Sequence, residues 1–158
     1  FPTRRSSDLD TEFNRMQFRG IMPVSIVVVD VDGLKQINDS RGHEAGDALI
    51  VAVANVLKEA FRGDDIVARI GGDEFAALLP ETGEAESLEV VDRMRKCQER
   101  HNSGGAKQMV SFSAGVATAV TGSDIPATFK RADAQMYADK MIRKASISGV
   151  AAALHEQV

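Results

Sequence analysis

The sequence predicts a single α+β domain in which a mostly antiparallel sheet is flanked by helices. Three observations predict this class. A β-branched run opens the domain at residues 24–29, a Gly-Gly turn joins two short apolar runs, and long amphipathic segments separate the strands. With 158 residues, the chain is long enough to bury a core of its own.

The expected elements follow the order helix, strand, helix, helix, strand, strand, helix, strand, helix. They cover residues 11–20, 24–29, 34–40, 44–61, 66–70, 75–79, 84–100, 109–120 and 123–143. Residues 1–10 resemble neither a helix nor a strand, so we interpret them as an artefact or a linker. The domain then spans residues 11–158, with a weakly patterned tail from about residue 145.

Local composition supports each element in turn. VSIVVV from Val24 is typical of a strand buried on both faces. The helices at 34–40, 44–61 and 84–100 show apolar residues every three or four positions. Gly71-Gly72 predicts a tight hairpin turn with positive φ angles. Period-two alternation marks the strand at 109–120, and Ser123-Asp124 caps the last helix.

This order of elements is that of a ferredoxin-like or polymerase-palm sheet, with the helices expected on one face. The composition argues against two classes of protein, nucleic-acid binders and membrane-spanning proteins. A net charge of −4 argues against a nucleic-acid binder, and no apolar run reaches the length of a membrane span. With Cys97 as its only cysteine, the sequence excludes an intrachain disulfide and fits a reducing, cytoplasmic compartment. A larger membrane-tethered parent protein stays open.

Acidic residues end the first strand and form the hairpin tip. Asp30 and Asp32 come at the end of the strand, and Asp73 and Glu74 follow the two glycines. If the first strand lies beside the hairpin, these carboxylates converge, and a cluster of that kind favours a hard cation such as Mg²⁺. Taken singly, each pair is equally compatible with an ordinary solvated turn.

The run Gly71-Gly72-Asp73-Glu74-Phe75 resembles the signature of the GGDEF family, the diguanylate cyclases. Further family-like segments follow the same order along the chain, and they run over residues 30–47, 65–70, 111–117 and 132–140. The resemblance covers residues 24–144. It implies a nucleotide cyclase fold that condenses two GTP into cyclic di-GMP and two pyrophosphates, with Mg²⁺ or Mn²⁺ as cofactor and two ions in each active site.

The resemblance also implies roles for individual residues. Asp30, the Val31 carbonyl, Asp73 and Glu74 would hold the metal, and the catalytic residues would be Asp73, Glu74 and Lys35. GTP would be bound by Gly33, Leu34, Asn38, His43, Asp47, Lys140 and Lys144. A carboxylate at Asp47 matches the N1–H and N2–H donors of guanine, which adenine lacks. The usual Gly-Arg-Asn turn after Lys140 is missing here, which leaves a second phosphate-binding lysine and a final strand open.

Arg62 and Asp65 resemble the Arg-x-x-Asp motif of the family's inhibitory site for cyclic di-GMP, and Arg93 would complete it. A pair with this spacing is otherwise common surface charge. The resemblance implies partners as well: catalysis across a homodimer, an upstream sensory or receiver module, and no contact of this domain with nucleic acid or membrane. Two other functions stay open, a non-catalytic module that binds GTP or cyclic di-GMP, and an ATP-using cyclase or polymerase palm.

Overall fold

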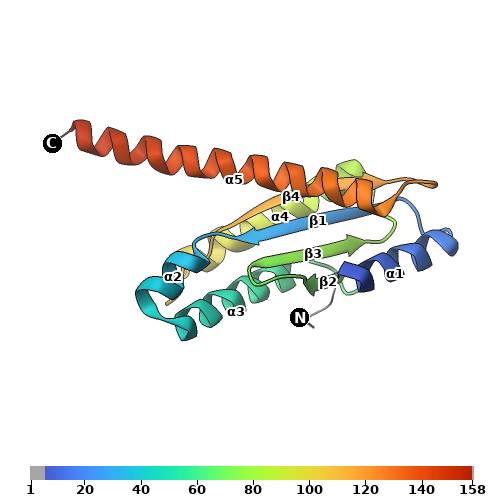
Figure 1. The fold of residues 1–158 in the computed structure, drawn as a ribbon, viewed down its shortest axis with the longest axis horizontal. Helices are drawn as coiled ribbons and strands as arrows, with labels where there is room; N and C mark the ends of the chain where they lie inside the picture. The colour runs from blue at the N-terminus through green and yellow to red at the C-terminus, as the bar shows by residue number, and fades with distance from the viewer. Residues whose placement is uncertain (1–5, 158) are drawn as a thin grey trace.

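The structure, a computed structural model, describes residues 6–157. This part of the chain forms five helices and four strands (Figure 1). Their bounds are α1 Ser6–Phe18, β1 Val24–Val31, α2 Leu34–Arg41, α3 His43–Ala60, β2 Ile66–Arg69, β3 Glu74–Leu79, α4 Glu84–Ser103, β4 Phe112–Ala119 and α5 Ile125–Glu156.

The four strands form one antiparallel sheet in the order β2-β3-β1-β4. β1 lies between β3 and β4, so both of its edges are paired and all eight of its residues are buried. The predicted α+β class and the placement of the first strand beside the hairpin are therefore confirmed. The pairing brings the end of β1 against the start of β3, at Asp30 opposite Glu74.

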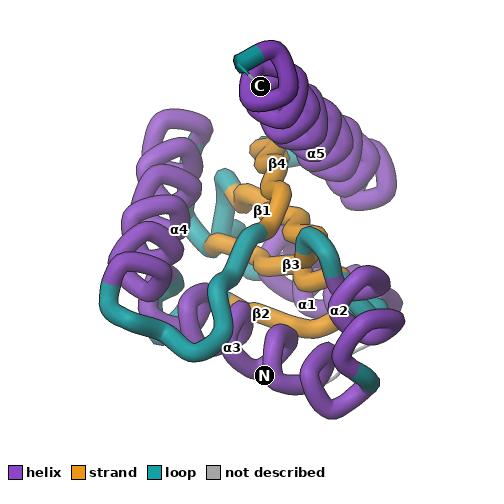
Figure 2. The backbone as a smooth tube through the Cα atoms, turned by 90° about the vertical axis from the view of Figure 1, so that its left-hand side faces the viewer, coloured by secondary structure: helices purple, strands orange, loops and turns teal. Residues whose placement is uncertain are grey.

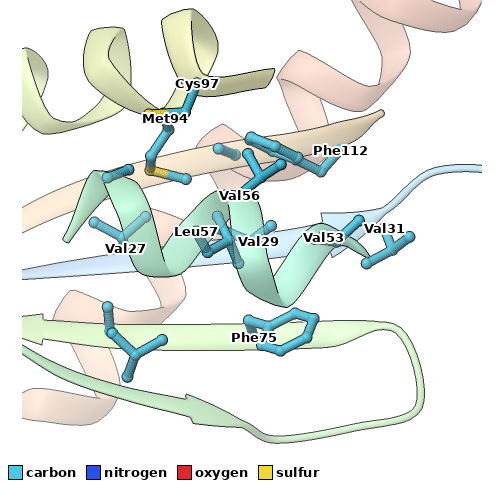
Figure 3. Packing of buried hydrophobic residues seen from close by; sticks show 14 of the residues in the cluster. Val27, Val29, Val31, Val53, Val56, Leu57, Phe75, Met94, Cys97 and Phe112 are labelled. Carbon is cyan, nitrogen blue, oxygen red and sulfur yellow. The ribbon is translucent and has the colours of Figure 1, made fainter. Parts of the chain in front are cut away.

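Helices cover both faces of the sheet, so the expectation of helices on one face is wrong. Figure 2 shows α3 and α4 on one side of the strands and α5 on the other. One core lies between the sheet and α3 and α4, and Figure 3 shows its members Val27, Val29 and Val31 of β1 with Val53, Val56 and Leu57 of α3. The second core joins the opposite side of β1, through Val24, Ile26 and Val28, to α1 and α5. A strand with apolar side chains on both faces needs cover on both.

The hairpin forms as predicted, but its geometry differs. Neither Gly71 nor Gly72 has a positive φ. The turn is longer than two residues, because β2 ends at Arg69 and β3 begins at Glu74. Gly71 leaves room for Glu74, since a Cβ on it would lie 2.9 Å from the Glu74 carboxylate and this flexible side chain would have to shift.

The two terminal helices are longer than the sequence predicted. α1 begins at Ser6, and its Leu9, Phe13 and Met16 are buried in the second core. Residues 1–5 lie outside the described residues, and the boundary placed at residue 10 remains a prediction. α5 continues through the weakly patterned tail to Glu156 and projects past the end of the sheet (Figure 1). Within residues 6–157, no helix is both long enough and apolar enough to cross a bilayer.

Candidate active site

Carboxylates from two elements meet at the edge where β1 ends. Asp30 pairs with Glu74 in the sheet register, and the Val31 N–H donates to the Asp73 carbonyl at 2.8 Å. The hairpin tip is thus fixed to the end of β1 by the backbone. Asp30 is buried, with 7% of its surface exposed, and Asp73 and Glu74 are half-buried. The convergence expected from the strand order is present for Asp30, Asp73 and Glu74.

This edge is electrostatically strained in a way that favours a cation. Burial raises the pKa of Asp30, and the neighbouring charges of Asp73 and Asp32 raise it further. Burial also raises the pKa of Glu74, together with Asp73, Asp30 and Asp133. Carboxylates that repel one another in a partly buried site are stabilised by a cation that neutralises them.

The described residues contain no group of three or more His, Cys, Asp or Glu side chains placed to enclose a metal on their own. Mg²⁺ does not need such a cage, because it is commonly held by one or two carboxylates together with substrate phosphates. Asp30 and Asp73 at one sheet edge, with the main chain of Val31 between them, fit that pattern of hard oxygen donors.

Removing one charge from this edge should change the pH dependence of stability. The raised pKa values of Asp30 and Glu74 mean that the folded state holds these protons more tightly than the unfolded state. Their contribution is therefore favourable below the ordinary carboxyl pKa and is lost as the pH rises through the raised values. In a chelating buffer, Glu74→Gln should flatten the fall in melting temperature above pH 4.5, the ordinary value. Parallel curves for the variant and the parent protein would contradict this account.

Lys140 lies at the carboxylate edge itself. Its Nζ is 3.0 Å from Asp30 Oδ1, and this hydrogen bond raises the pKa of Lys140. The ammonium occupies one oxygen of the carboxylate that the sequence assigned to the metal. Lys144, one helical turn further along α5, is exposed.

The hairpin tip is held by an arginine that the sequence did not single out. Arg69 Nε donates to the Gly71 carbonyl at 3.1 Å, and its Nη2 donates to the Gly72 carbonyl at 2.7 Å. Two bonds from one planar guanidinium fix both glycine peptides directly before Asp73. Only its place next to the glycine pair hinted at this role.

The Asp32 carboxylate is engaged by two serines. Its two carboxylate oxygens accept hydrogen bonds from Ser111 Oγ at 2.8 Å and Ser113 Oγ at 2.9 Å. Its N–H donates to the Ser111 carbonyl at 2.9 Å. Asp32 therefore connects the end of β1 to the start of β4, and its charge still acts on Asp30.

A helix start follows these aspartates. Gly33 is the N-cap of α2 with φ +78°, a left-handed conformation that a glycine adopts without strain. The Ile37 N–H donates to the Gly33 carbonyl, which leaves the preceding first-turn amides, those of Leu34 and Lys35, directed out of the helix start. The Lys35 side chain is exposed. Free amides beside a flexible ammonium make a seat for phosphate oxygens.

The end of α2 and the start of α3 bring together the residues expected to recognise the base. Asn38 Oδ1 is buried and has no hydrogen-bond partner among the described residues. Gly46 lies directly against it, since a Cβ on Gly46 would stand 1.8 Å from that oxygen. Asp47 is the next residue and is exposed, as is His43. A buried amide oxygen that lacks a donor is suited to a ligand that supplies one.

The three residues predicted for a product site also come together. The Arg62 N–H donates to Asp65 Oδ2 at 2.7 Å, in the turn that follows α3. Arg93 reaches this turn from α4, where its Nε donates to the Ala60 carbonyl and its Nη2 is buried without a partner in the described part of the chain. Burial raises the pKa of Asp65, and the charges of Arg62 and Arg93 oppose that rise.

The antiparallel sheet, with a strand-end carboxylate facing an acidic hairpin beside a helix start, has the architecture of the palm-type nucleotide cyclase class. The family described as "Diguanylate cyclase, GGDEF domain" matches residues 3–146. The chain belongs to this family.

Individual relatives support the family assignment. The response regulator PleD of Caulobacter vibrioides is 36% identical over 139 residues, which cover 82% of this chain and 30% of PleD. The GGDEF domain of PA1120 (TpbB or YfiN) from Pseudomonas aeruginosa has a TM-score of 0.75 at 31% identity, over 89% of this chain and 85% of that one. The GGDEF domain of DgcB from Caulobacter crescentus, solved in complex with c-di-GMP, has a TM-score of 0.71 at 26% identity, over 86% and 82%. The chain thus spans less than a third of the length of PleD.

Proposed function

We propose that this domain is an active diguanylate cyclase that condenses two GTP into cyclic di-GMP and releases two pyrophosphates. The observation that carries the proposal is the meeting of Asp30 with the Asp73-Glu74 tip at one sheet edge. A domain that only bound nucleotide would not need three mutually repelling carboxylates at this edge.

Asp30, the Val31 carbonyl, Asp73 and Glu74 would hold two divalent cations, Mg²⁺ or Mn²⁺. When bound, such ions neutralise phosphate charge and acidify a coordinated hydroxyl. Asp73 would accept the proton of one GTP's ribose 3′-hydroxyl as that oxygen bonds to the α-phosphorus of the other GTP. The bond from that phosphorus to the bridging oxygen breaks, and pyrophosphate leaves.

The phosphates would lie at the start of α2. The amides of Gly33 and Leu34 and the ammonium of Lys35 would stabilise the charge that develops on the phosphates. Lys140 and Lys144 would approach from α5, and the first must release Asp30 Oδ1, or share it, to contact a phosphate. Guanine would lie against Asn38 and Asp47, with His43 beside it.

Each domain binds one GTP, so the two attacks require two copies related by a two-fold axis. We therefore propose a homodimer as the active form. An upstream sensory or receiver module would control the pairing, in line with the response regulator among the relatives, and the domain would work in the cytoplasm.

The test is incubation of the purified domain, at high protein concentration, with GTP and Mg²⁺, and identification of products by mass spectrometry. Cyclic di-GMP and pyrophosphate in a 1:2 ratio, lost on addition of a chelator, are expected. ATP should yield no cyclic product. Tight GTP binding without turnover would identify a binding module instead, and cyclic product from ATP would overturn the role of Asn38 and Asp47.

Gly46→Ala should weaken GTP binding through Asn38. The new Cβ would stand 1.8 Å from Asn38 Oδ1 and 2.8 Å from its Cγ, so the amide must leave its place against the base. Losing one hydrogen bond to the base should raise KM for GTP by about 10-fold with little change in kcat. Asn38→Ala should give a similar KM. Adding Gly46→Ala to Asn38→Ala should then have no further effect, and a second 10-fold loss would contradict this mechanism.

Product binding at the turn after α3 should depend on the Arg62 guanidinium. Arg62 is exposed, and the charges of Arg62 and Arg93 both act on Asp65. Arg62→Ala should raise the cyclic di-GMP concentration for half-inhibition by about 10-fold or more, since charge-assisted bonds to guanine or phosphate are lost. The initial rate without product should not change. Arg100→Ala, which removes an exposed arginine of α4, is the matched control. The same half-inhibiting concentration of cyclic di-GMP in both variants would exclude this site.

A further inference from the structure

One row of polar side chains on α5 follows the free edge of β4. β4 is the last strand of the sheet, so its outer backbone groups have no neighbouring strand. Arg131 Nη2 donates to the Thr118 carbonyl at 2.9 Å, Gln135 Oε1 accepts from the Val116 N–H at 3.3 Å, and Asp139 Oδ2 accepts from the Ala114 N–H at 2.9 Å. The three side chains are four residues apart, so they share one face of the helix.

The row ends in a bridge to the helix on the other face of the sheet. Arg95 of α4 passes around the edge of β4, where its Nη1 donates to the Phe112 carbonyl at 2.6 Å and its Nη2 contacts Asp139 Oδ2 at 2.6 Å. Its guanidinium also stacks 4.8 Å from the centre of the Phe112 ring. Arg143 adds a third bond to Asp139 Oδ2, at 3.1 Å. Both partners of the Arg95–Asp139 pair are at least two-thirds buried, with 21% and 27% of their side-chain surfaces exposed.

We propose that Asp139 and Arg95 are positioning residues that hold α5 in register along β4 and thereby place Lys140 against Asp30. This inference rests on the proposed function, because Lys140 is there a phosphate ligand. Lys140 directly follows the residue that Arg95 holds. A slip of α5 by one turn, about 5.4 Å, would carry its ammonium out of reach of both Asp30 and the phosphates.

Gly115 and Asp139 restrain α5 in different directions. Gly115 restrains its distance from β4, and Asp139 restrains its position along β4. At Gly115 the backbones of β4 and α5 are in direct contact, since a Cβ there would stand 2.2 Å from the Ala132 carbonyl oxygen. That contact sets how closely α5 approaches the strand. It does not oppose sliding as strongly as the charged bonds at Asp139, which connect α5 to two specific groups, the Ala114 N–H and the Arg95 guanidinium.

Lysine labelling tests the placement without reference to activity. An ammonium held in an ion pair reacts slowly with an acylating reagent, and the label on each lysine is counted by mass spectrometry. Asp139→Ala should raise the labelling rate of Lys140 about 3-fold to 10-fold, the size expected from losing one half-buried pair, as Asp30→Asn should. The exposed Lys144 is the internal reference, and Asp92→Ala, which removes the exposed pair with Lys96, is the matched control. An unchanged Lys140 rate in a folded Asp139→Ala protein overturns the proposal.

If Asp139→Ala does not fold, two milder variants serve in its place. Asp139→Asn keeps an acceptor for the Ala114 N–H and loses the charge, and Arg95→Met removes the bridge from the α4 side. Either should raise Lys140 labelling. A folded pair of variants that both leave it unchanged overturns the proposal equally.

A double-mutant cycle tests whether Asp139 affects substrate binding through Lys140. 3′-Deoxy-GTP lacks the attacking hydroxyl, so with Mg²⁺ it reports binding without turnover. Asp139→Ala and Lys140→Met should each weaken its binding about 10-fold, and the double variant should be no weaker than Lys140→Met by more than about 2-fold, because Asp139 acts through Lys140. Multiplying effects would show a separate, merely structural role and overturn the proposal. If labelling behaves as expected but the parent protein neither binds the analogue nor turns over GTP, the proposed function fails and the placement of Lys140 stands.

Discussion

Replacing Asp73 with alanine should lower cyclic di-GMP formation by about 1,000-fold or more while leaving the fold intact. Asp73 is proposed both to hold the metal and to accept the 3′-hydroxyl proton, and loss of either role removes several orders of magnitude. Its side chain is half-buried at the hairpin tip, where its backbone carbonyl accepts the Val31 N–H. That backbone bond survives the substitution, so the hairpin should stay beside β1.

The same variant should be at least as stable as the parent protein when no metal is present. Asp73 raises the pKa of both Asp30 and Glu74 by like-charge repulsion, and its removal relieves both. Thermal unfolding in a chelator, beside product assays at saturating GTP and Mg²⁺, gives both readings. A folded Asp73→Ala protein that keeps more than about a tenth of the parent's turnover would refute the role of this carboxylate.

The part of the site that the sequence predicted depends on strand order. Once a β-branched strand ending in Asp30 is followed by a helix and then a hairpin, few arrangements keep the connections short, and most place the strand beside the hairpin. The pairing of Asp30 with Glu74 is the outcome. The helix start at Gly33 was equally accessible, because a glycine before an amphipathic run is a local signal.

The residues that the sequence missed act through contacts that leave no local pattern. Arg69 donates to two carbonyl groups, and any neighbouring segment offers carbonyl groups. Arg95 and Asp139 are far apart in the chain and meet only because α4 and α5 lie on opposite faces of an edge strand. Asp32 belongs to the acidic cluster expected from the sequence, but its carboxylate accepts hydrogen bonds from Ser111, directly before β4, and from Ser113 of β4. The contacts of Asp139 and Asp32 both depend on β4 lying beside β1 at the edge of the sheet, and that follows only from the assembled sheet.

The last helix shows the opposite case, in which local preference decides. Residues 145–156 form the tail that the sequence predicts to be weakly patterned, and they are exposed wherever the structure describes their side chains. The sequence therefore predicts that the last helix ends at about residue 143, but α5 continues to Glu156. Ala145 and the alanines at 151–153 have high intrinsic helix propensity, which can extend an established helix without burial.

Gly115→Ala should be the most destabilising single-methyl change considered for this protein. The added Cβ would stand 2.2 Å from both the Ala132 carbonyl oxygen and the Met136 amide nitrogen, and these are backbone atoms that no rotamer change can move aside. β4 and α5 must separate, which opens the second core and should cost about 3 kcal/mol or more, or a fall in melting temperature of about 6 °C or more. Gly149→Ala in α5 is the matched control, because no atom lies within 4 Å of the new Cβ. It should stabilise the protein by about 0.5–1 kcal/mol through helix propensity. Similar unfolding temperatures for the two variants would show that α5 does not lie directly against the backbone of β4, and Lys140 would then lose the support that sets its distance from the sheet.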